Sequence, residues 1–335
     1  MGCHLKSNFS SVICRAVDAP IEPPAMQRLF HDETIPDQFR GAVLALGNFD
    51  GFHLGHQAVV NRAIALGFHM RRPVIVATFD PHPVRHFRPD VPPFRLTTLD
   101  QRQELFAHAG ADAMLVFRFG PEMAATSAEG FVTDVLANKL GASGVVTGDD
   151  FTFGKGRTGS IAMLKELGAH TGIQAEAVAP VLYEGERISS GRIREALEAG
   201  DIALATHLMS RDFAIEGVVQ RGDRRGRELG YPTANLVLGD YQRPKYGIYA
   251  VRVTLDEGSE VPGVASFGVR PTFEPAVELL EAHLFDFDGD LYGRRIEVAL
   301  HAFIRDEKKF ESLDTLVEHM RADEAAARTL LALPI

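Results

Sequence analysis

The chain has 335 residues, 45% hydrophobic and 24% charged, with a formal net charge of -10 at pH 7. This length exceeds the usual size of one hydrophobic core, so we expect two domains. The acidic balance disfavours a nucleic-acid partner, and the absence of a long apolar run disfavours a membrane partner. The only cysteines, Cys3 and Cys14, do not suffice for a disulfide framework and fit a cytoplasmic protein.

Residues 1–25 lack the continuous apolar segment of a signal peptide, and we expect them to form a poorly ordered extension. An equally good account of this extension is that translation truly starts at Met26 and that the initiation codon has been placed upstream of it. Recognisable patterning begins only at Gly41, directly before the first apolar run.

The first half of the chain alternates continuous apolar runs with amphipathic stretches. The runs begin at Ala42, Pro73, Ala113 and Gly144. Apolar runs of this kind are typical of strands buried on both faces of a parallel sheet. The stretches between them, 57–70, 99–109 and 128–140, are long enough for crossover helices. The sequence therefore predicts an α/β, Rossmann-like domain over residues 26–209.

The second half, residues 210–335, has a different pattern. Short strand-like runs are separated by Gly, Pro and Asp, which predicts an antiparallel β-barrel. A final helix from Leu313 to about Leu333 would pack on that barrel through Leu316, Met320, Leu330 and Leu331.

The glycine-rich segment LGNFDGFHLGH, residues 46–56, joins the first strand to the first helix. Its glycines, among them Gly47 and Gly55, would let the backbone approach a bound group closely. His56 lies where the helix begins, a position that favours phosphate, and His53 can reach the same group. On these residues alone, a phosphate site and a purely structural turn are equally supported.

A second segment, ISSGRIR, follows at residues 188–194 and strengthens the phosphate interpretation. Ser189 and Ser190 are expected helix caps, with Arg192 and Arg194 behind them. Together with GNFDGFHLGH, this segment resembles the FMN adenylyltransferase module of bacterial bifunctional riboflavin kinase/FAD synthetases. TFDPHP at 78–83 and GDDFTFGKGRTG at 148–159 extend the resemblance, which covers about residues 41–205.

This resemblance implies phosphate contacts and a flavin pocket. One family position differs, because Gly191 stands where the family has a threonine and a hydroxyl is missing. The implied ATP and phosphate contacts are Gly47, Phe49, Gly55, Ser189, Ser190 and Arg192, with catalytic roles for His53 and His56 and flavin contacts for Pro81, Pro83 and Asp150.

The segment RGDRRGRELGYPTANL, residues 221–236, combines glycines and arginines with a Pro-Thr-Ala-Asn tetrad. The oxygens of Thr233 and Asn235 are hard ligands of the kind that Mg²⁺ prefers. No GxxxxGK[ST] motif is present, so P-loop kinase reasoning does not apply. From about residue 211 to 333 the chain resembles riboflavin kinase instead.

The kinase resemblance runs through GRELGYPTANL, YGIYAV, VRPTF, EAHLFDFDGDLYG and FIRDEKKF in the family's order. Ser266 and Phe267 depart from the residues that the family commonly has. The resemblance implies Glu281 as the general base, Thr233 and Asn235 at Mg²⁺, Gly222, Arg227 and Gly230 in the nucleotide loop, and Arg305 on the flavin side.

These patterns predict an enzyme that phosphorylates riboflavin to FMN and then adenylylates FMN to FAD, with ATP as co-substrate and Mg²⁺ in both steps. Three alternatives stay open: a riboflavin kinase with an impaired adenylyltransferase domain, a non-catalytic flavin-binding sensor, and a nucleotidylyltransferase for another acceptor such as pantetheine phosphate. The sequence does not specify an oligomeric state.

Overall fold

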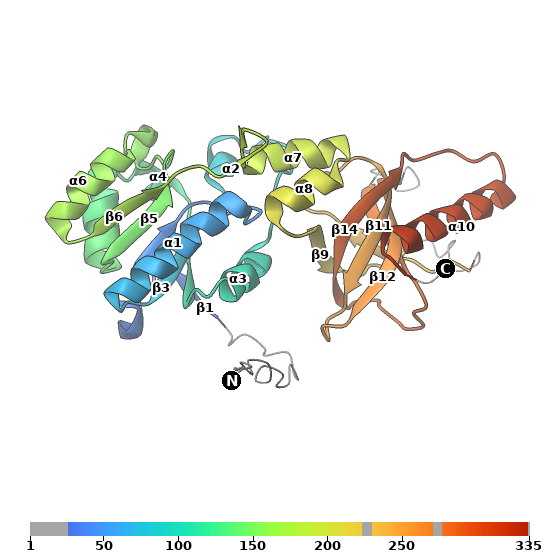
Figure 1. Cartoon of the computed structure of the whole chain (residues 1–335), viewed down its shortest axis with the longest axis horizontal. Helices are drawn as coiled ribbons and strands as arrows, with labels where there is room; N and C mark the ends of the chain where they lie inside the picture. Colours follow the sequence, from blue (N-terminus) through green and yellow to red (C-terminus); the bar gives the residue numbers. More distant parts are fainter. Residues whose placement is uncertain (1–25, 223–229, 271–276, 334–335) are drawn as a thin grey trace, which may run out of the picture.

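The computed structural model describes residues 26–222, 230–270 and 277–333. It consists of an α/β domain and an antiparallel β-barrel placed side by side, with two short helices between them (Figure 1). The predicted fold class is confirmed for both halves.

The α/β domain is built on a parallel sheet with the strand order β1-β4-β3-β2-β5-β6. The inner strands are buried along their length, as their continuous apolar sequences predict. The strands are β1 (Gln27–Phe30), β2 (Val43–Leu46), β3 (Val74–Asp80), β4 (Ala113–Arg118), β5 (Gly144–Gly148) and β6 (Gln174–Val178).

Strand β2 lies where the winding of the sheet reverses. From β2 the chain adds β3 and β4 on one side, and it later adds β5 and β6 on the other. In such sheets ligands bind beyond the carboxyl ends of the strands at this reversal point. The loop that leaves β2 is the histidine-containing segment, so the fold places this segment where a ligand is expected.

Strand β1 corrects one prediction, because regular structure begins well before Gly41. Gln27 to Phe30 pair in parallel with Ala113 to Val116, and Met26 is buried. The strand has four residues at the sheet edge and only Leu29 fully buried, so it lacks the apolar run that marks the inner strands. Residues 1–25 lie outside the described part of the chain.

The crossover helices have local signals at their ends. His53 caps α1, and Thr98 and Gln101 form a reciprocal capping box on α3. The stretch predicted as a helix over 128–140 starts as α5 and continues with π-helical turns. The bounds are α1 (Leu54–Met70), α2 (Pro83–Phe87), α3 (Leu99–His108), α4 (Pro121–Ala125), α5 (Ala128–Gly130), the π-helical segment Phe131–Lys139, α6 (Ile161–Thr171), α7 (Ser190–Ala199) and α8 (Ile202–Met209).

The second half is an antiparallel sheet with the order β10-β13-β12-β11-β14-β9. Its two edge strands approach each other, because Gln220, just after β9, forms an antiparallel bridge with Asn235 on β10. That bridge closes the sheet toward a barrel. The strands are β9 (Phe213–Val218), β10 (Ala234–Val237), β11 (Gly247–Thr254), β12 (Glu260–Arg270), β13 (Val277–Leu284) and β14 (Arg295–Arg305).

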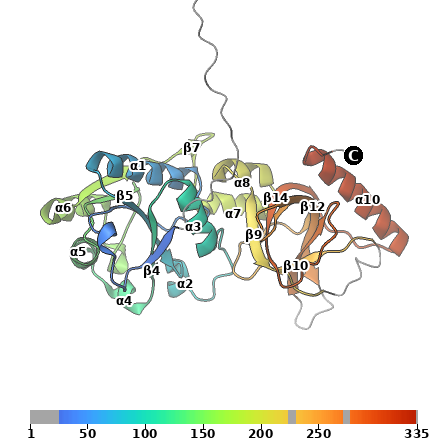
Figure 2. The ribbon, with the colours of Figure 1, turned by 90° about the horizontal axis from the view of Figure 1, so that it is seen from below.

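Helix α10 (Leu313–Leu330) packs on the outside of the barrel against β11, β12 and β14 (Figure 2). The predicted packing face is right for Leu331, which is buried, and wrong for Leu330, which is 46% exposed. The buried positions include Ala327 and Asp323, because small and ion-paired side chains bring the helix close to the sheet.

Helices α7 and α8 join the two halves. Ile193 and Leu197 of α7 and Leu208 of α8 belong to the same buried apolar cluster as barrel residues such as Phe213 and Leu300. The cluster buries side chains from both sides of residue 210. The hydrophobic core of the barrel therefore continues into the two helices that precede it.

A buried polar contact also connects α3 to the barrel half. The hydroxyl of Tyr241 donates to Oε1 of Gln101 at 2.8 Å and accepts from the backbone N–H of Glu216 at 3.2 Å. Tyr241 is 4% exposed, so water cannot replace these partners if the hydroxyl is removed.

We therefore expect Tyr241→Phe to lower the free energy of unfolding by about 1 to 3 kcal/mol, because it leaves buried polar groups unpaired. Urea denaturation followed by circular dichroism measures the change. Tyr292→Phe is the control, since the Tyr292 hydroxyl makes no hydrogen bond within the described part of the chain and its loss should cost under about 0.5 kcal/mol. Equal effects of the two variants would contradict the expectation.

Candidate functional site

The first candidate site begins with the two histidines at the start of α1. His53 lies at the N-cap, and its Nδ1 accepts the backbone N–H of His56 at 3.2 Å. The two imidazole rings stack with their centroids 3.6 Å apart. Because Nδ1 of His53 is an acceptor, the proton of the neutral ring is on Nε2, which can donate to another group.

The glycines of this loop allow close packing. A Cβ on Gly55 would lie 3.1 Å from the ring of His53, and one on Gly47 would lie 3.2 Å from the ring of Phe49. Phe49 itself is buried, has a positive φ of 49° and packs its ring against that of His56 with the centroids 5.2 Å apart. The backbone can therefore turn sharply beneath the two imidazoles.

Burial keeps both imidazoles uncharged. Desolvation, assisted by the charge of Arg187, lowers the pKa of His53 to about 4. Burial also holds the pKa of His56 well below its usual range, with the neighbouring His53 as the next cause. At neutral pH the pair therefore provides hydrogen-bond donors without positive charge.

The start of α7 lies against the same loop. Ser189 caps the helix by accepting the N–H of Arg192, and the Ser190 hydroxyl donates to the backbone carbonyl of Asp50 at 2.8 Å. Gly191 follows in the first turn, where a Cβ would meet only the Ser189 hydroxyl, at 3.6 Å. The missing threonine side chain is therefore not excluded by steric crowding.

The two arginines of ISSGRIR point to different partners. Arg192 donates to the carbonyl of Tyr183 and pairs with Glu186, in the hairpin formed by β7 (Leu182–Tyr183) and β8 (Glu186–Arg187). Arg194 instead pairs with the buried carboxylate of Asp50 at 2.6 Å. The sequence prediction assigned a phosphate contact to Arg192 and placed Arg194 behind the helix caps, but it gave no role to Asp50 and did not predict the pairing of Asp50 with Arg194, which depends on the tertiary fold.

The residues predicted for the flavin pocket lie around the ends of β3 and β5. Pro81 follows β3 directly, and Pro83 is the first residue of α2. Asp150 lies after β5 and pairs with Arg187 at 2.7 Å. Arg187, for which no role was predicted, thus pairs with Asp150 and also adds positive charge near His53.

The second candidate site lies at the beginning of β10. Asn235 is 5% exposed, and its Oδ1 has no hydrogen-bond partner in the described part of the chain. A Cβ on Gly222 would lie only 2.5 Å from Nδ2 of Asn235, so glycine is required for this approach. Thr233 immediately precedes the strand, and Gly230 has a positive φ of 83°. Arg227 lies outside the described residues.

Glu281 of β13 is paired in register with Asn235 on one side and with Ser266 of β12 on the other. The structure therefore brings the predicted base beside one predicted metal ligand. Phe267 is fully buried and lies in the barrel core, so its departure from the family pattern fills the interior.

Arg305, predicted on the flavin side, holds α10 in place. Its guanidinium makes a bidentate ion pair with Asp323 at 2.6 and 2.7 Å, and Asp323 is 6% exposed. A flavin contact by Arg305 stays a prediction.

The start of α1, rich in hydrogen-bond donors, lies at the reversal point of the parallel sheet, and β10 carries an amide oxygen that is unpaired within the described ranges. Both features are typical of transferases that use nucleotides. Family models agree: an FAD synthetase model matches residues 35–192, and a riboflavin kinase model matches residues 209–331. The chain belongs to the bifunctional riboflavin kinase/FMN adenylyltransferase family.

Relatives of that description match most of the chain. Those of Escherichia coli strain K12 and Pseudomonas fluorescens are each 40% identical, over 88% of this chain and 94% of theirs. A solved structure from Streptococcus pneumoniae, described as a macrolide-efflux protein, is 30% identical, covers 90% of this chain and 99% of its own, and superimposes with a TM-score of 0.81. None of the helices in the described ranges has the length and apolar character to cross a membrane.

The protein therefore phosphorylates riboflavin to FMN and adenylylates FMN to FAD, with ATP as the co-substrate of both reactions. The alternatives of a non-catalytic sensor and of a transferase for another acceptor are not supported by these relatives.

The depressed histidine pKa values predict a pH-dependent stability. Burial lowers the pKa of His82, like that of His53, to about 4. Between pH 6.5 and 4 the unfolded chain binds protons that the folded chain does not, so stability is present above that window and is lost as pH falls through it. Each histidine contributes up to about 1.4 kcal/mol per pH unit.

His82→Asn should flatten the decline in unfolding free energy between pH 6.5 and 4, as measured by urea denaturation at several pH values. Asparagine keeps an acceptor for the Val84 N–H that His82 caps. His69→Asn removes an exposed histidine and is the control. An unchanged slope in His82→Asn would show that this group is not buried in its neutral form.

Proposed function

We propose that FMN adenylylation takes place between the start of α1 and the start of α7. The phosphate of FMN forms a bond to the α-phosphorus of ATP while the bond to the β-phosphate breaks and pyrophosphate leaves. Donors aimed at the growing negative charge contribute most to such a step. The neutral, stacked His53 and His56, with the proton of His53 on Nε2, carry this proposal.

The surrounding residues would hold the two substrates. The glycines of the loop and the serines at α7 are proposed to contact ATP, while the residues after β3 and β5 shape the flavin pocket. The proposed ATP contacts are Gly47, Phe49, Gly55, Ser189, Ser190 and Arg192, and the proposed flavin contacts are Pro81, Pro83 and Asp150.

We further propose that Glu281 accepts the proton of the ribityl 5'-hydroxyl of riboflavin while the oxygen takes the γ-phosphoryl group and ADP leaves. A base near the acceptor hydroxyl is what this reaction needs. The pairing of Glu281 opposite Asn235 supports the assignment. Gly222, Gly230 and Arg227 would form the nucleotide loop, and Arg305 would support the flavin side.

Mg²⁺ fits the residues at β10. The buried Oδ1 of Asn235 has no partner in the described ranges, and amide and hydroxyl oxygens suit this ion. Thr233 and Asn235 would hold it together with phosphate oxygens. When bound, Mg²⁺ would neutralise charge on the transferred phosphoryl group.

The proposal divides the chain into an adenylyltransferase domain over 26–209 and a kinase domain over 210–335. It includes a cytoplasmic location and no nucleic-acid or membrane partner, supported by the net charge of -10 and the two cysteines. The oligomeric state is not part of it.

Separate sites predict separable losses. His53→Ala combined with His56→Ala should lower FAD formation from FMN by about 100-fold or more and leave FMN formation from riboflavin intact. Glu281→Ala should do the reverse. Chromatography of the products, with each flavin supplied separately, measures both. His170→Ala, at an exposed histidine, is the control, and parallel loss of both activities would rule out two independent sites.

The metal assignment predicts a specific defect. Asn235→Ala should lower riboflavin kinase kcat/KM at least about tenfold and raise the Mg²⁺ concentration needed for half activity, because it removes one oxygen ligand. Asn235→Asp keeps an oxygen and should retain more activity. Adenylylation of FMN by both variants checks that the chain is folded. An unchanged Mg²⁺ titration in Asn235→Ala would disprove the ligand role.

A further inference from the structure

One segment of the adenylyltransferase half pairs directly with the kinase half. Arg95 forms a parallel bridge with Tyr241, donating its N–H to the carbonyl of Asp240 at 3.0 Å and accepting the N–H of Gln242 at 2.7 Å. Residues 240–242 follow β10 after a short turn, so the strand that carries Asn235 leads straight into this contact.

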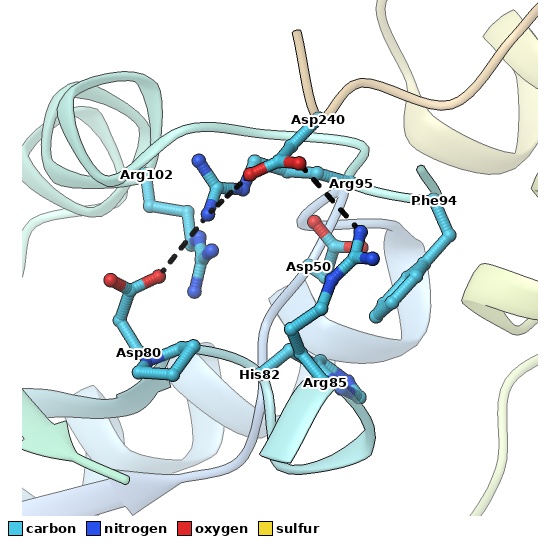
Figure 3. Close-up of a pocket in the computed structure, with 9 residues that line it drawn as sticks. Asp50, Asp80, His82, Arg85, Phe94, Arg95, Arg102 and Asp240 are labelled. Carbon is cyan, nitrogen blue, oxygen red and sulfur yellow. Dashed lines mark ion pairs between the residues drawn. The ribbon is translucent and has the colours of Figure 1, made fainter. Parts of the chain in front are cut away.

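A cavity of about 160 Å³ lies beside this contact (Figure 3). Most of its lining comes from the adenylyltransferase half, including Asp80 at the end of β3, Pro81 and Arg85 of α2. Among the described lining residues, Asp240 is the one contributed by the kinase half. The wall of a cavity next to the proposed flavin loop is thus completed by the other catalytic domain.

The charges around the cavity show what Asp240 does there. Its carboxylate lies between the guanidinium groups of Arg85 and Arg95, at 3.8 and 4.0 Å. Arg95 also faces Asp80 at 3.6 Å. A third cation, the almost fully buried Arg102, lines the same space and has an unpartnered Nε within the described part of the chain. Without Asp240, three arginines would share this space with less negative charge to balance them.

The two arginines that face Asp240 lie on the proposed flavin loop or against it. Arg85 lies two residues after Pro83 in α2, and Arg95 faces the carboxylate that directly precedes Pro81. An attraction that holds both arginines therefore holds the loop between β3 and α2. Such pairs act through Coulomb attraction at distances longer than a direct hydrogen bond, and salt weakens them.

We propose that Asp240, a residue of the kinase half, is a positioning residue for the flavin acceptor in FMN adenylylation. The inference rests on the proposed flavin role of Pro81 and Pro83. Within the described part of the chain Asp240 makes no contact with His53 or His56. It would therefore affect the binding of FMN and not the transfer of the adenylyl group. FMN binding in the adenylyltransferase half then depends on a residue of the kinase half, while the kinase reaction does not depend on the adenylyltransferase loop.

The test measures KM and kcat for FMN adenylylation in the full-length Asp240→Asn protein. Asp240 is 59% exposed at its side chain, so the expected rise in KM for FMN is modest, about two- to fivefold, with kcat within about twofold. Riboflavin kinase activity should stay unchanged. In about 1 M salt the difference in KM between variant and wild type should disappear, because exposed charges are then screened.

Two further variants make the outcomes distinct. Glu318→Gln removes one exposed negative charge on α10 and should leave KM for FMN unaltered at any salt concentration. Asp240→Glu keeps the charge and should restore most of the affinity. A merely structural role would instead lower kcat, kinase activity and the unfolding midpoint together, independently of salt.

A Pro83→Ala variant shows whether a negative result concerns Asp240 alone or the proposed flavin pocket as a whole. If Pro83→Ala raises KM for FMN and Asp240→Asn does not, the role of Asp240 is wrong and the pocket stands. If neither variant changes KM for FMN, the assignment of the loop to the flavin is wrong as well.

Discussion

The ion pair between Asp50 and Arg194 holds together the segments of the proposed adenylylation site. Asp50 is 3% exposed and lies inside the histidine loop, while Arg194, on α7, is 144 residues further along the chain. The other carboxylate oxygen accepts the N–H groups of Leu96 and Thr97. Removing one partner of a buried ion pair leaves an uncompensated charge, at a cost of about 3 to 5 kcal/mol. One carboxylate thus fixes three segments relative to one another.

The geometry of the proposed site follows from this arrangement. With Asp50 held in place, its carbonyl can accept the Ser190 hydroxyl, so the start of α7 is placed against the start of α1. The backbone of the same loop also accepts two hydrogen bonds from Arg211, just beyond α8. Burial lowers the pKa of Arg211 to about 10 and still leaves it charged at neutral pH. Two helix starts and the link to the barrel therefore converge on residues 50–53.

Sequence patterns predicted the fold class and the segments of both candidate sites, because glycines, histidines and the Pro-Thr-Ala-Asn tetrad are concentrated in short stretches. They could not show which of Arg192 and Arg194 faces the histidine loop, since that depends on how α7 is rotated against its neighbours. Strand β1 was missed because an edge strand of four residues has almost no periodic signal. The contributions of Asp50 and Asp240 arise from contacts between distant segments, which local patterns do not contain.

The shared apolar cluster of α7, α8 and the barrel limits where the chain can be cut into two independently folding fragments. A gene truncated at residue 210 would release a polypeptide ending in helices whose apolar side chains, such as Leu197 and Leu208, had lost their cover. The complementary fragment would lose part of its own interior. Neither fragment would keep a complete hydrophobic core. Exchange of one activity between genes would therefore require a boundary upstream of α7, or other helices that cover the barrel in place of α7 and α8.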